Sequence, residues 1–144
     1  MYGFVVGGQG PFNAETELLS LADWTWSSRA KYPFANSISL HATAMHNDVF
    51  YVFGGYDYLS EESRDLVTIA QYNPDSDTWT QIGELNTARR QHDVIVSQGA
   101  FLVIGYGSAE NCQLKGNSMT CMSQEPYISR NVWILQTYFS SLLL

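Results

Sequence analysis

The chain has 144 residues, a length typical of one domain, and its 45% apolar and 14% aromatic content indicates a globular protein rather than a disordered one. Its formal net charge of −7, with only 7 Lys and Arg, would repel a phosphate backbone, so we expect no nucleic-acid partner. No apolar run approaches the roughly 18 residues of a membrane span, and residues 1–8 have no basic segment before their apolar residues. We therefore expect neither a membrane span nor a signal peptide in this sequence.

A sequence motif recurs at a period of about fifty residues, as in repeat architectures. Residues 4–8 (FVVGG) return as 51–55 (YVFGG) and, in altered form, as 102–107 (LVIGYG). The glycines of the three copies are Gly7 and Gly8, Gly54 and Gly55, and Gly105 and Gly107. Trp26 and Trp79, 53 residues apart, form a second mark with nearly the same period. Because the glycine motif and the tryptophan recur with nearly the same period, the chain is predicted to consist of repeated units.

Each unit is predicted to consist of short antiparallel strands. Its apolar residues come in runs rich in Val, Ile, Tyr, Phe and Trp that are bounded by turn residues. In the middle unit, the expected strands are 38–45, 49–54, 66–72 and 77–82. Asn47-Asp48 is suited to a tight hairpin turn, and residues 73–77 (NPDSD) to a second turn. The predicted fold class is therefore all-β, with four antiparallel strands in each repeat, as in a β-propeller blade.

The middle unit resembles the kelch repeat, whose blades carry a Gly-Gly doublet, then an aromatic residue, then a Trp. In this sequence these are Gly54-Gly55, Tyr72 and Trp79, and residues 85–92 (LNTARRQH) resemble the link into the next inner strand. The resemblance covers nearly the whole chain. It implies a kelch-type β-propeller, in which the Trp ring packs against the neighbouring blade and its N–H needs an acceptor.

The resemblance divides the chain into an incomplete first blade over 1–37, a complete blade over 38–83 and an incomplete third blade over 84–137. Residues 138–144 fit no repeat. In the third unit, 108–130 is expected to be an insertion, and 131–135 (NVWIL) stands where a third strand belongs. Because propellers close with roughly four to eight blades, this ring is incomplete. We expect a part of a longer protein or, alternatively, self-association of two or more copies that completes a ring.

The two cysteines are placed symmetrically about a probable hairpin turn. Cys112 and Cys121 are equidistant from Gly116-Asn117, a dipeptide suited to a two-residue turn. They would then form a non-hydrogen-bonded pair, in which the Cα atoms approach to roughly 4.5 Å and a disulfide fits. A disulfide points to an oxidising compartment and a secreted or extracellular parent protein. Two free thiols, as in an intracellular adaptor, are the alternative.

No catalytic or metal-binding motif is predicted. His41, His46 and His92 share no spacing that would place metal ligands on one face, and residues 61–65 (EESRD) are expected to form a solvated loop. We therefore expect no cofactor and no enzyme activity. Some kelch-like propellers are copper radical oxidases with tyrosine, cysteine and histidine ligands, but that constellation cannot be located in this sequence.

Loops of one face of the predicted disc are the expected binding surface. The loop between the second and third strands and the link between blades emerge at the same end. These segments are 9–16, 28–37, 56–65, 84–91 and 106–130. On this face Arg89, Arg90, Tyr56 and Tyr58 are the candidate partner-binding residues, because Arg and Tyr are favoured interface anchors. The alternative is that one of the two arginines caps the loop by binding carbonyls.

The resemblance implies a protein–protein interaction module whose partner is another protein. Two alternatives remain open: a fragment of a secreted kelch-like enzyme such as a copper radical oxidase, and a structural piece with no ligand of its own.

Overall fold

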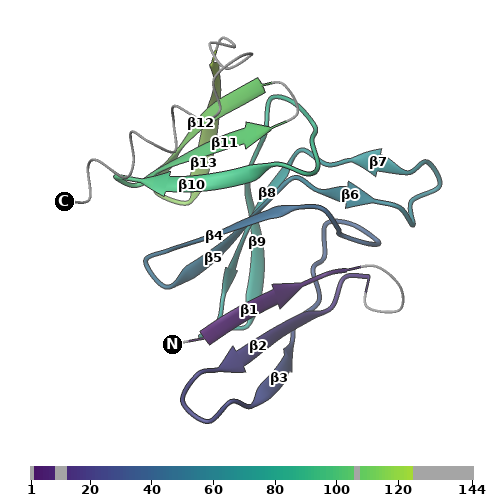
Figure 1. The fold of residues 1–144 in the computed structure, drawn as a ribbon, viewed down its shortest axis with the longest axis vertical. Coiled ribbons are helices and arrows are strands. Elements are labelled where there is room, and N and C mark those ends of the chain that lie inside the picture. Colours follow the sequence, from purple (N-terminus) through teal and green to yellow (C-terminus); the bar gives the residue numbers. More distant parts are fainter. Residues whose placement is uncertain (1, 9–12, 106–107, 125–144) are drawn as a thin grey trace.

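The computed structural model describes residues 2–8, 13–105 and 108–124, and within these ranges all regular secondary structure is β-strand (Figure 1). Three antiparallel sheets follow one another in chain order. The first contains β1 (Tyr2–Val6), β2 (Thr16–Ser20) and β3 (Trp26–Arg29). The second contains β4 (Ala42–His46), β5 (Val49–Phe53), β8 (Thr68–Asn73) and β9 (Thr78–Glu84). The third contains β10 (Asp93–Ser97), β11 (Ala100–Gly105), β12 (Ser108–Lys115) and β13 (Ser118–Gln124).

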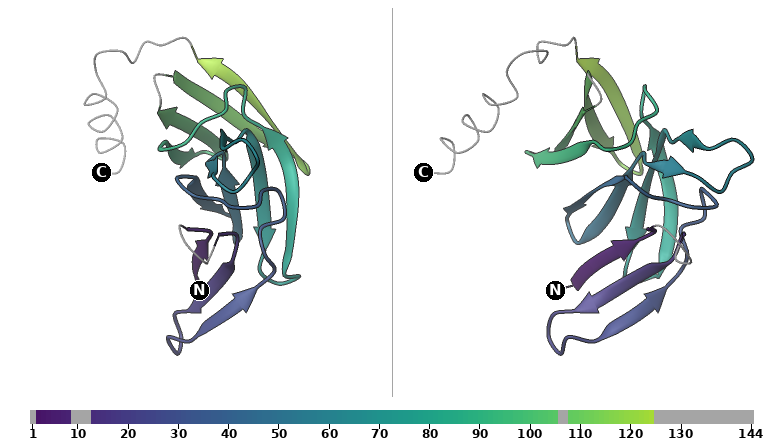
Figure 2. Two further views of the ribbon diagram at one scale, coloured as in Figure 1. Left: turned by 90° about the vertical axis from the view of Figure 1, so that its right-hand side faces the viewer. Right: turned by 45° about the vertical axis from the view of Figure 1, so that its right-hand side comes forward.

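The sheets lie one after another along an arc (Figure 2). In each sheet, neighbouring strands are also consecutive main strands of the chain, so every sheet is an up-and-down meander. A small hairpin, β6 (Tyr56–Asp57) and β7 (Arg64–Asp65), occupies the loop between β5 and β8. Within the described ranges, no helix is available that could cross a membrane.

The turns of the second sheet form as the sequence predicts. Asn47 and Asp48 have φ of 51° and 59°, the pair of positive angles that a type I′ hairpin requires, and they join β4 to β5. Asn73 Oδ1 accepts hydrogen bonds from the backbone N–H groups of Asp75 and Ser76, which closes the turn between β8 and β9. These two turns lie at the end of the sheet opposite the β6–β7 hairpin (Figure 1), and we call this end the turn face.

Trp79 links the second sheet to the first. Its ring centroid lies 5.9 Å from that of Phe4 and 5.1 Å from that of Tyr32. Its indole N–H donates to the carbonyl oxygen of Ala30 at 2.9 Å, which satisfies the expected need for an acceptor. Trp26 marks the same position one repeat earlier but remains 55% exposed, because no described sheet covers that side of β3.

The Gly-Gly doublets let the link of each following unit approach closely. A Cβ on Gly54 would lie 2.6 Å from the carbonyl oxygen of Arg89, and one on Gly7 would lie 2.0 Å from that of Ile38. Both glycines have positive φ. The second glycine of each doublet donates its N–H to the same carbonyl, from Gly8 to Ile38 and from Gly55 to Arg89. The repeat in the sequence is thus a repeat of one inter-sheet contact.

The third sheet differs from the sequence prediction. Residues 108–130 were expected to be an insertion in an incomplete blade, but β12 pairs directly with β11, and β13 with β12. The cysteine hairpin therefore forms the third and fourth strands of this sheet. The hairpin itself was predicted, but it was assigned to an insertion because its two strands lack the aromatic residue and the Trp that identify the third and fourth strands of the second unit. Gly107 and the segment 131–135 lie outside the described residues.

The core lies between the sheets. Phe53, Phe101 and Val103 belong to the cluster that joins the second and third sheets, while Val52, Ile38 and Ala70 belong to one that joins the first and second. Strand β5 supplies both clusters because its successive side chains point to opposite faces. Each sheet therefore depends on its neighbour to bury its apolar surface.

Candidate partner-binding face

The β6–β7 hairpin and the links between sheets meet at one end of the molecule, which we call the loop face. Tyr56 pairs with Ser39 through two backbone hydrogen bonds of 2.8 and 3.1 Å. The backbone N–H of Leu66 donates to Gly55, and that of Arg89 donates to Leu66. The hairpin is therefore fixed to both links rather than extending freely into solvent.

Asp57 holds the link between the first and second sheets. Its buried carboxylate accepts hydrogen bonds from the backbone N–H groups of Asn36 and Ser37, both at 3.1 Å, and from the Ser37 hydroxyl at 2.8 Å. Burial by itself raises the pKa of Asp57, but these hydrogen bonds together with one from Leu59 outweigh it and keep the pKa below its ordinary value. Asp57 is therefore charged and immobile at neutral pH.

Arg90 lies on the loop face, where the sequence places it. Its guanidinium carbon is 4.2 Å from the centre of the Tyr56 ring, a cation–π contact, and its Nε lies 3.4 Å from a carboxylate oxygen of Asp65. The Arg90 side chain keeps 31% of its surface exposed. Tyr58 is half-buried, and its hydroxyl donates to Asn13 Oδ1. The structure thus brings together Arg90 and Tyr56, and ties Tyr58 to the preceding sheet.

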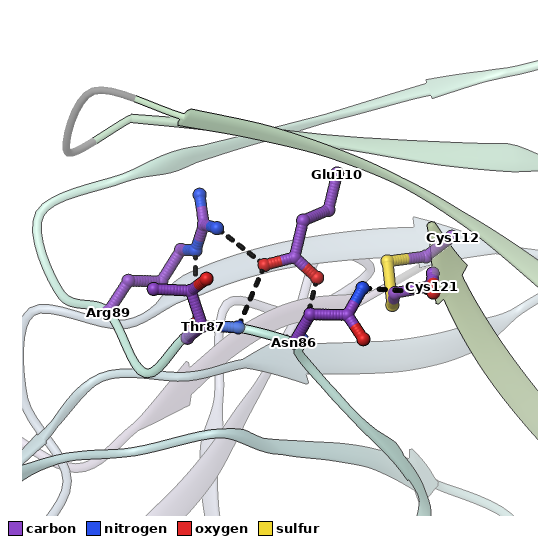
Figure 3. The surroundings of a disulfide bond; sticks show 6 residues. All are labelled: Asn86, Thr87, Arg89, Glu110, Cys112 and Cys121. Carbon is purple, nitrogen blue, oxygen red and sulfur yellow. Dashed lines mark hydrogen bonds and ion pairs between the residues drawn. A yellow bond between two sulfur atoms is a disulfide. The ribbon is translucent and has the colours of Figure 1, made fainter. Parts of the chain in front are cut away.

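Arg89 points into the protein instead. Its side chain is fully buried and donates to the carbonyl oxygens of Thr87, Gly105 and Ser108. It also forms an ion pair with Glu110, with Nη2 and Oε1 separated by 2.5 Å (Figure 3). This arrangement corresponds to the alternative in which one arginine caps the loop. Arg89 positions the link, and its guanidinium does not contact solvent.

Glu110 repeats the role of Asp57 one sheet later. It accepts hydrogen bonds from the backbone N–H groups of Asn86 and Thr87 at 2.8 and 3.2 Å (Figure 3). Asn36-Ser37 and Asn86-Thr87 are thus equivalent turns, each held by a buried carboxylate of the following repeat unit. The sequence pattern did not indicate either acid, because the two occupy different places in their units, Asp57 in the β6–β7 hairpin and Glu110 in strand β12. The recurring Asn-Ser/Thr dipeptide was the available signal.

The disulfide lies beside this ion pair. Cys112 and Cys121 are bonded, with their Cα atoms 4.0 Å apart, and they face each other across β12 and β13 in the predicted register (Figure 3). Asn86 Nδ2 donates to the carbonyl oxygen of Cys121 at 3.0 Å. The predicted pairing is confirmed, and the bridge fixes the hairpin to which the link is attached.

One cluster of possible metal ligands occurs among the described residues: Glu110, Cys112 and Cys121. Both sulfurs are used by the disulfide, and the carboxylate is occupied by Arg89, Asn86 and Thr87. While the disulfide and the ion pair are formed, these three side chains have no set of atoms free to bind a metal ion.

His41 and His92 occupy equivalent positions beside the glycines of consecutive sheets. A Cβ on Gly55 would lie 2.9 Å from His41 Cβ, and one on Gly105 would lie 2.8 Å from His92 Cβ. Burial, with a smaller contribution from the charge of His92, lowers the pKa of His41 to about 4. Burial, followed by the charge of Arg89, also lowers the pKa of His92. Both rings are therefore neutral at pH 7 and serve the packing between links and sheets.

Comparison with known proteins identifies the repeat at the second sheet. The Kelch motif family matches residues 38–86, which comprise the second sheet and the link that follows it. Residues 38–86 of this chain thus carry a Kelch motif. Kelch-like protein 15 of Mus musculus is 28% identical over 100 residues, which cover 67% of this chain and 16% of that protein. Kelch-like protein 15 of Danio rerio is 28% identical over 105 residues, covering 71% of the chain and 17% of the relative.

The fold also has a counterpart among solved structures. The structure of YjhT superposes with a TM-score of 0.68 at 15% identity, covering 83% of this chain and 48% of YjhT. At that identity the likeness concerns the fold alone. The matched part of this chain spans about half the length of the YjhT structure and about one sixth of the length of Kelch-like protein 15. The three described sheets of this chain form part of a β-propeller and do not close a ring.

Proposed function

We propose that this kelch segment is a protein-interaction module that binds its partner through the loop face. The observation that carries the proposal is the partly exposed side chain of Arg90, whose guanidinium lies over Tyr56 and against Asp65. Arginine and tyrosine are favoured anchors because they contribute large contact areas and directional hydrogen bonds at a low entropy cost when they are already ordered.

The support for this anchor is rigid. Tyr56 is hydrogen-bonded to Ser39, and the next residue, Asp57, holds the preceding link through its buried carboxylate. Leu59, which is 48% exposed, adds an apolar side chain to the same loop, and its backbone N–H donates to Asp57. The resulting surface combines an aromatic ring, a cation and an apolar side chain on a fixed scaffold, which is the usual composition of an interface centre.

Site-specific photocrosslinking in cells of the source organism tests the proposal. A benzoylphenylalanine placed at Leu59 should yield discrete protein adducts, whereas one at Asn117, in the β12–β13 turn, should not give the same adducts. Arg90→Ala should reduce the Leu59 adducts about tenfold, as expected for a hot-spot side chain. Arg64→Ala, which removes an exposed arginine from the same hairpin, is the matched control and should leave them nearly unchanged. Equal adducts from both positions, or adducts insensitive to Arg90→Ala, would contradict the proposal.

A further inference from the structure

Three side chains that can bind a metal ion converge at the junction between the second and third sheets (Figure 3). The two cysteine sulfurs and a carboxylate oxygen of Glu110 all lie within 4.8 Å of one another. Glu110 and Cys112 are alternate residues of β12, so they point to the same face of the sheet, and Cys121 stands opposite Cys112 on β13. The convergence therefore follows from the strand register.

The strand register also holds the two cysteines together independently of their covalent bond. β12 and β13 are paired over seven consecutive residues on each strand, and no bulge interrupts the ladder. Cys112 is fully buried in the core cluster between the two sheets, and the carbonyl oxygen of Cys121 is bound by Asn86. After reduction, the two thiols would therefore still face each other, since directly opposed side chains have Cβ atoms about 4.5 to 5.5 Å apart.

The Glu110 carboxylate is already oriented beside the sulfurs. Its Oε1 accepts from Thr87 and Arg89, and its Oε2 accepts from Asn86. An ionised carboxylate offers about four acceptor positions, so the donors of the described residues leave one on Oε2 for a metal ion. Hydrogen bonds of this kind fix the orientation of a ligand and are typical of the surroundings of metal sites.

The charges of the site balance when a zinc ion is bound. Arg89 and Glu110 are buried, where an uncompensated charge is costly. Together, Zn²⁺ and the guanidinium balance two thiolates and one carboxylate, so the bound state leaves no net charge in the interior. Two sulfurs and one oxygen favour Zn²⁺ over Mg²⁺ or Ca²⁺, which take oxygen ligands.

We propose that the reduced form of the hairpin binds Zn²⁺ through Cys112, Cys121 and Glu110. A dithiol reductant transfers two electrons to the disulfide, which gives two thiols while the reductant becomes a disulfide. Zn²⁺ then displaces both thiol protons to solvent. Disulfide and zinc exclude each other, so the redox state of the surroundings decides which of the two fixes the hairpin. The site is separate from the loop face and does not depend on the function proposed there.

The test uses the 144-residue chain, reduced with a phosphine that is then removed under argon. Co²⁺ replaces Zn²⁺ as a spectroscopic probe and should give a thiolate-to-cobalt absorption that saturates at one ion per chain. Zn²⁺ should abolish this absorption, because it binds such sites more tightly than Co²⁺. In chain labelled with ¹³C at the glutamate carboxylates, Zn²⁺ should shift the Glu110 resonance, whereas that of the exposed Glu84 should remain in place.

Two variants and the unreduced chain are the controls. Cys121→Ser should weaken Co²⁺ binding at least about a hundredfold, since it removes a direct ligand. Met122→Ser changes the next residue, which is 60% exposed, and should leave the affinity unchanged. The unreduced chain should show no thiolate-to-cobalt absorption.

Four outcomes would overturn the proposal. They are no thiolate-to-cobalt absorption in the reduced chain, equal affinities of the two variants, equal absorption of the reduced and unreduced chains, and a Glu110 resonance that Zn²⁺ does not move. Near-ultraviolet circular dichroism monitors the fold throughout. Because the ligands converge only in the folded hairpin, a reduced chain that loses this signal and does not regain it with Zn²⁺ would also contradict the site.

Discussion

Arg89 and Glu110 form an ion pair in the interior of the molecule, with Nη2 and Oε1 2.5 Å apart and side-chain exposures of 0% and 1%. The pair joins the link after the second sheet to strand β12 of the third. The Glu110 carboxylate also accepts hydrogen bonds from the backbone N–H groups of Asn86 and Thr87 in the same link. The neighbouring residue, Arg90, faces outward to Tyr56, so one arginine builds the junction and the next is presented on its surface.

Removing the charge of Glu110 should destabilise the protein strongly. Glu110→Gln leaves the buried Arg89 guanidinium without its counter-ion, and breaking such a pair costs about 3 to 5 kcal/mol. The free energy of unfolding, measured by urea denaturation, should fall by this amount. Glu15→Gln, which removes the exposed pair with Lys31, is the control and should cost less than about 1 kcal/mol. Similar costs for the two variants would mean that the Arg89 junction is not formed as described.

The disulfide should contribute to the stability of the third sheet. It closes a loop with a sequence separation of 9, so chain entropy predicts a contribution of about 2 to 3 kcal/mol. Cys112→Ala combined with Cys121→Ala should lower the free energy of unfolding by this amount, and adding a thiol reductant to the wild type should have the same effect. The unreduced, denatured protein should show no free thiols, and a count of two would exclude the bridge.

Acidification should weaken the protein through its buried histidines. Because the pKa of His41 is lowered from 6.5 to about 4, the unfolded chain binds a proton that the folded chain does not. The contribution of neutral His41 to the free energy of unfolding is therefore fully present above about pH 6.5 and is lost as the pH falls to about 4. The loss at His41 is at most about 3.5 kcal/mol, since the pKa falls from 6.5 to about 4 and one pKa unit corresponds to about 1.4 kcal/mol. Urea denaturation between pH 7 and 4 should show the free energy of unfolding falling with pH, and His41→Gln should reduce this dependence. If the variant shows the same pH dependence as the wild type, groups other than His41 are responsible for it.

Gly54 should tolerate no side chain. It has φ of +52°, and a Cβ there would lie 2.6 Å from the Arg89 carbonyl oxygen. Gly116 has φ of +60° but open space around it, so it isolates the cost of the backbone conformation. Gly54→Ala should therefore lower the free energy of unfolding by at least about 2 kcal/mol more than Gly116→Ala, which should cost about 1 to 2 kcal/mol. Equal costs in thermal or urea unfolding would show that the link does not approach the glycine this closely.

Local pattern in the sequence determined the all-β class, the strands of the second sheet and the Asn47-Asp48 turn. The same is true of the cysteine register, because a two-residue turn fixes which residues of a hairpin oppose each other. These features depend on contacts within one unit, where strand alternation and turn chemistry are readable from neighbouring residues.

The tertiary structure decided which arginine is buried, which carboxylates hold the links and how the third sheet is completed. Arg89 and Arg90 are adjacent and chemically identical, and only the position of Glu110, 21 residues away from Arg89, separates their roles. Such contacts join residues of different sheets, so their geometry follows from packing between blades, which the period of the repeat does not specify.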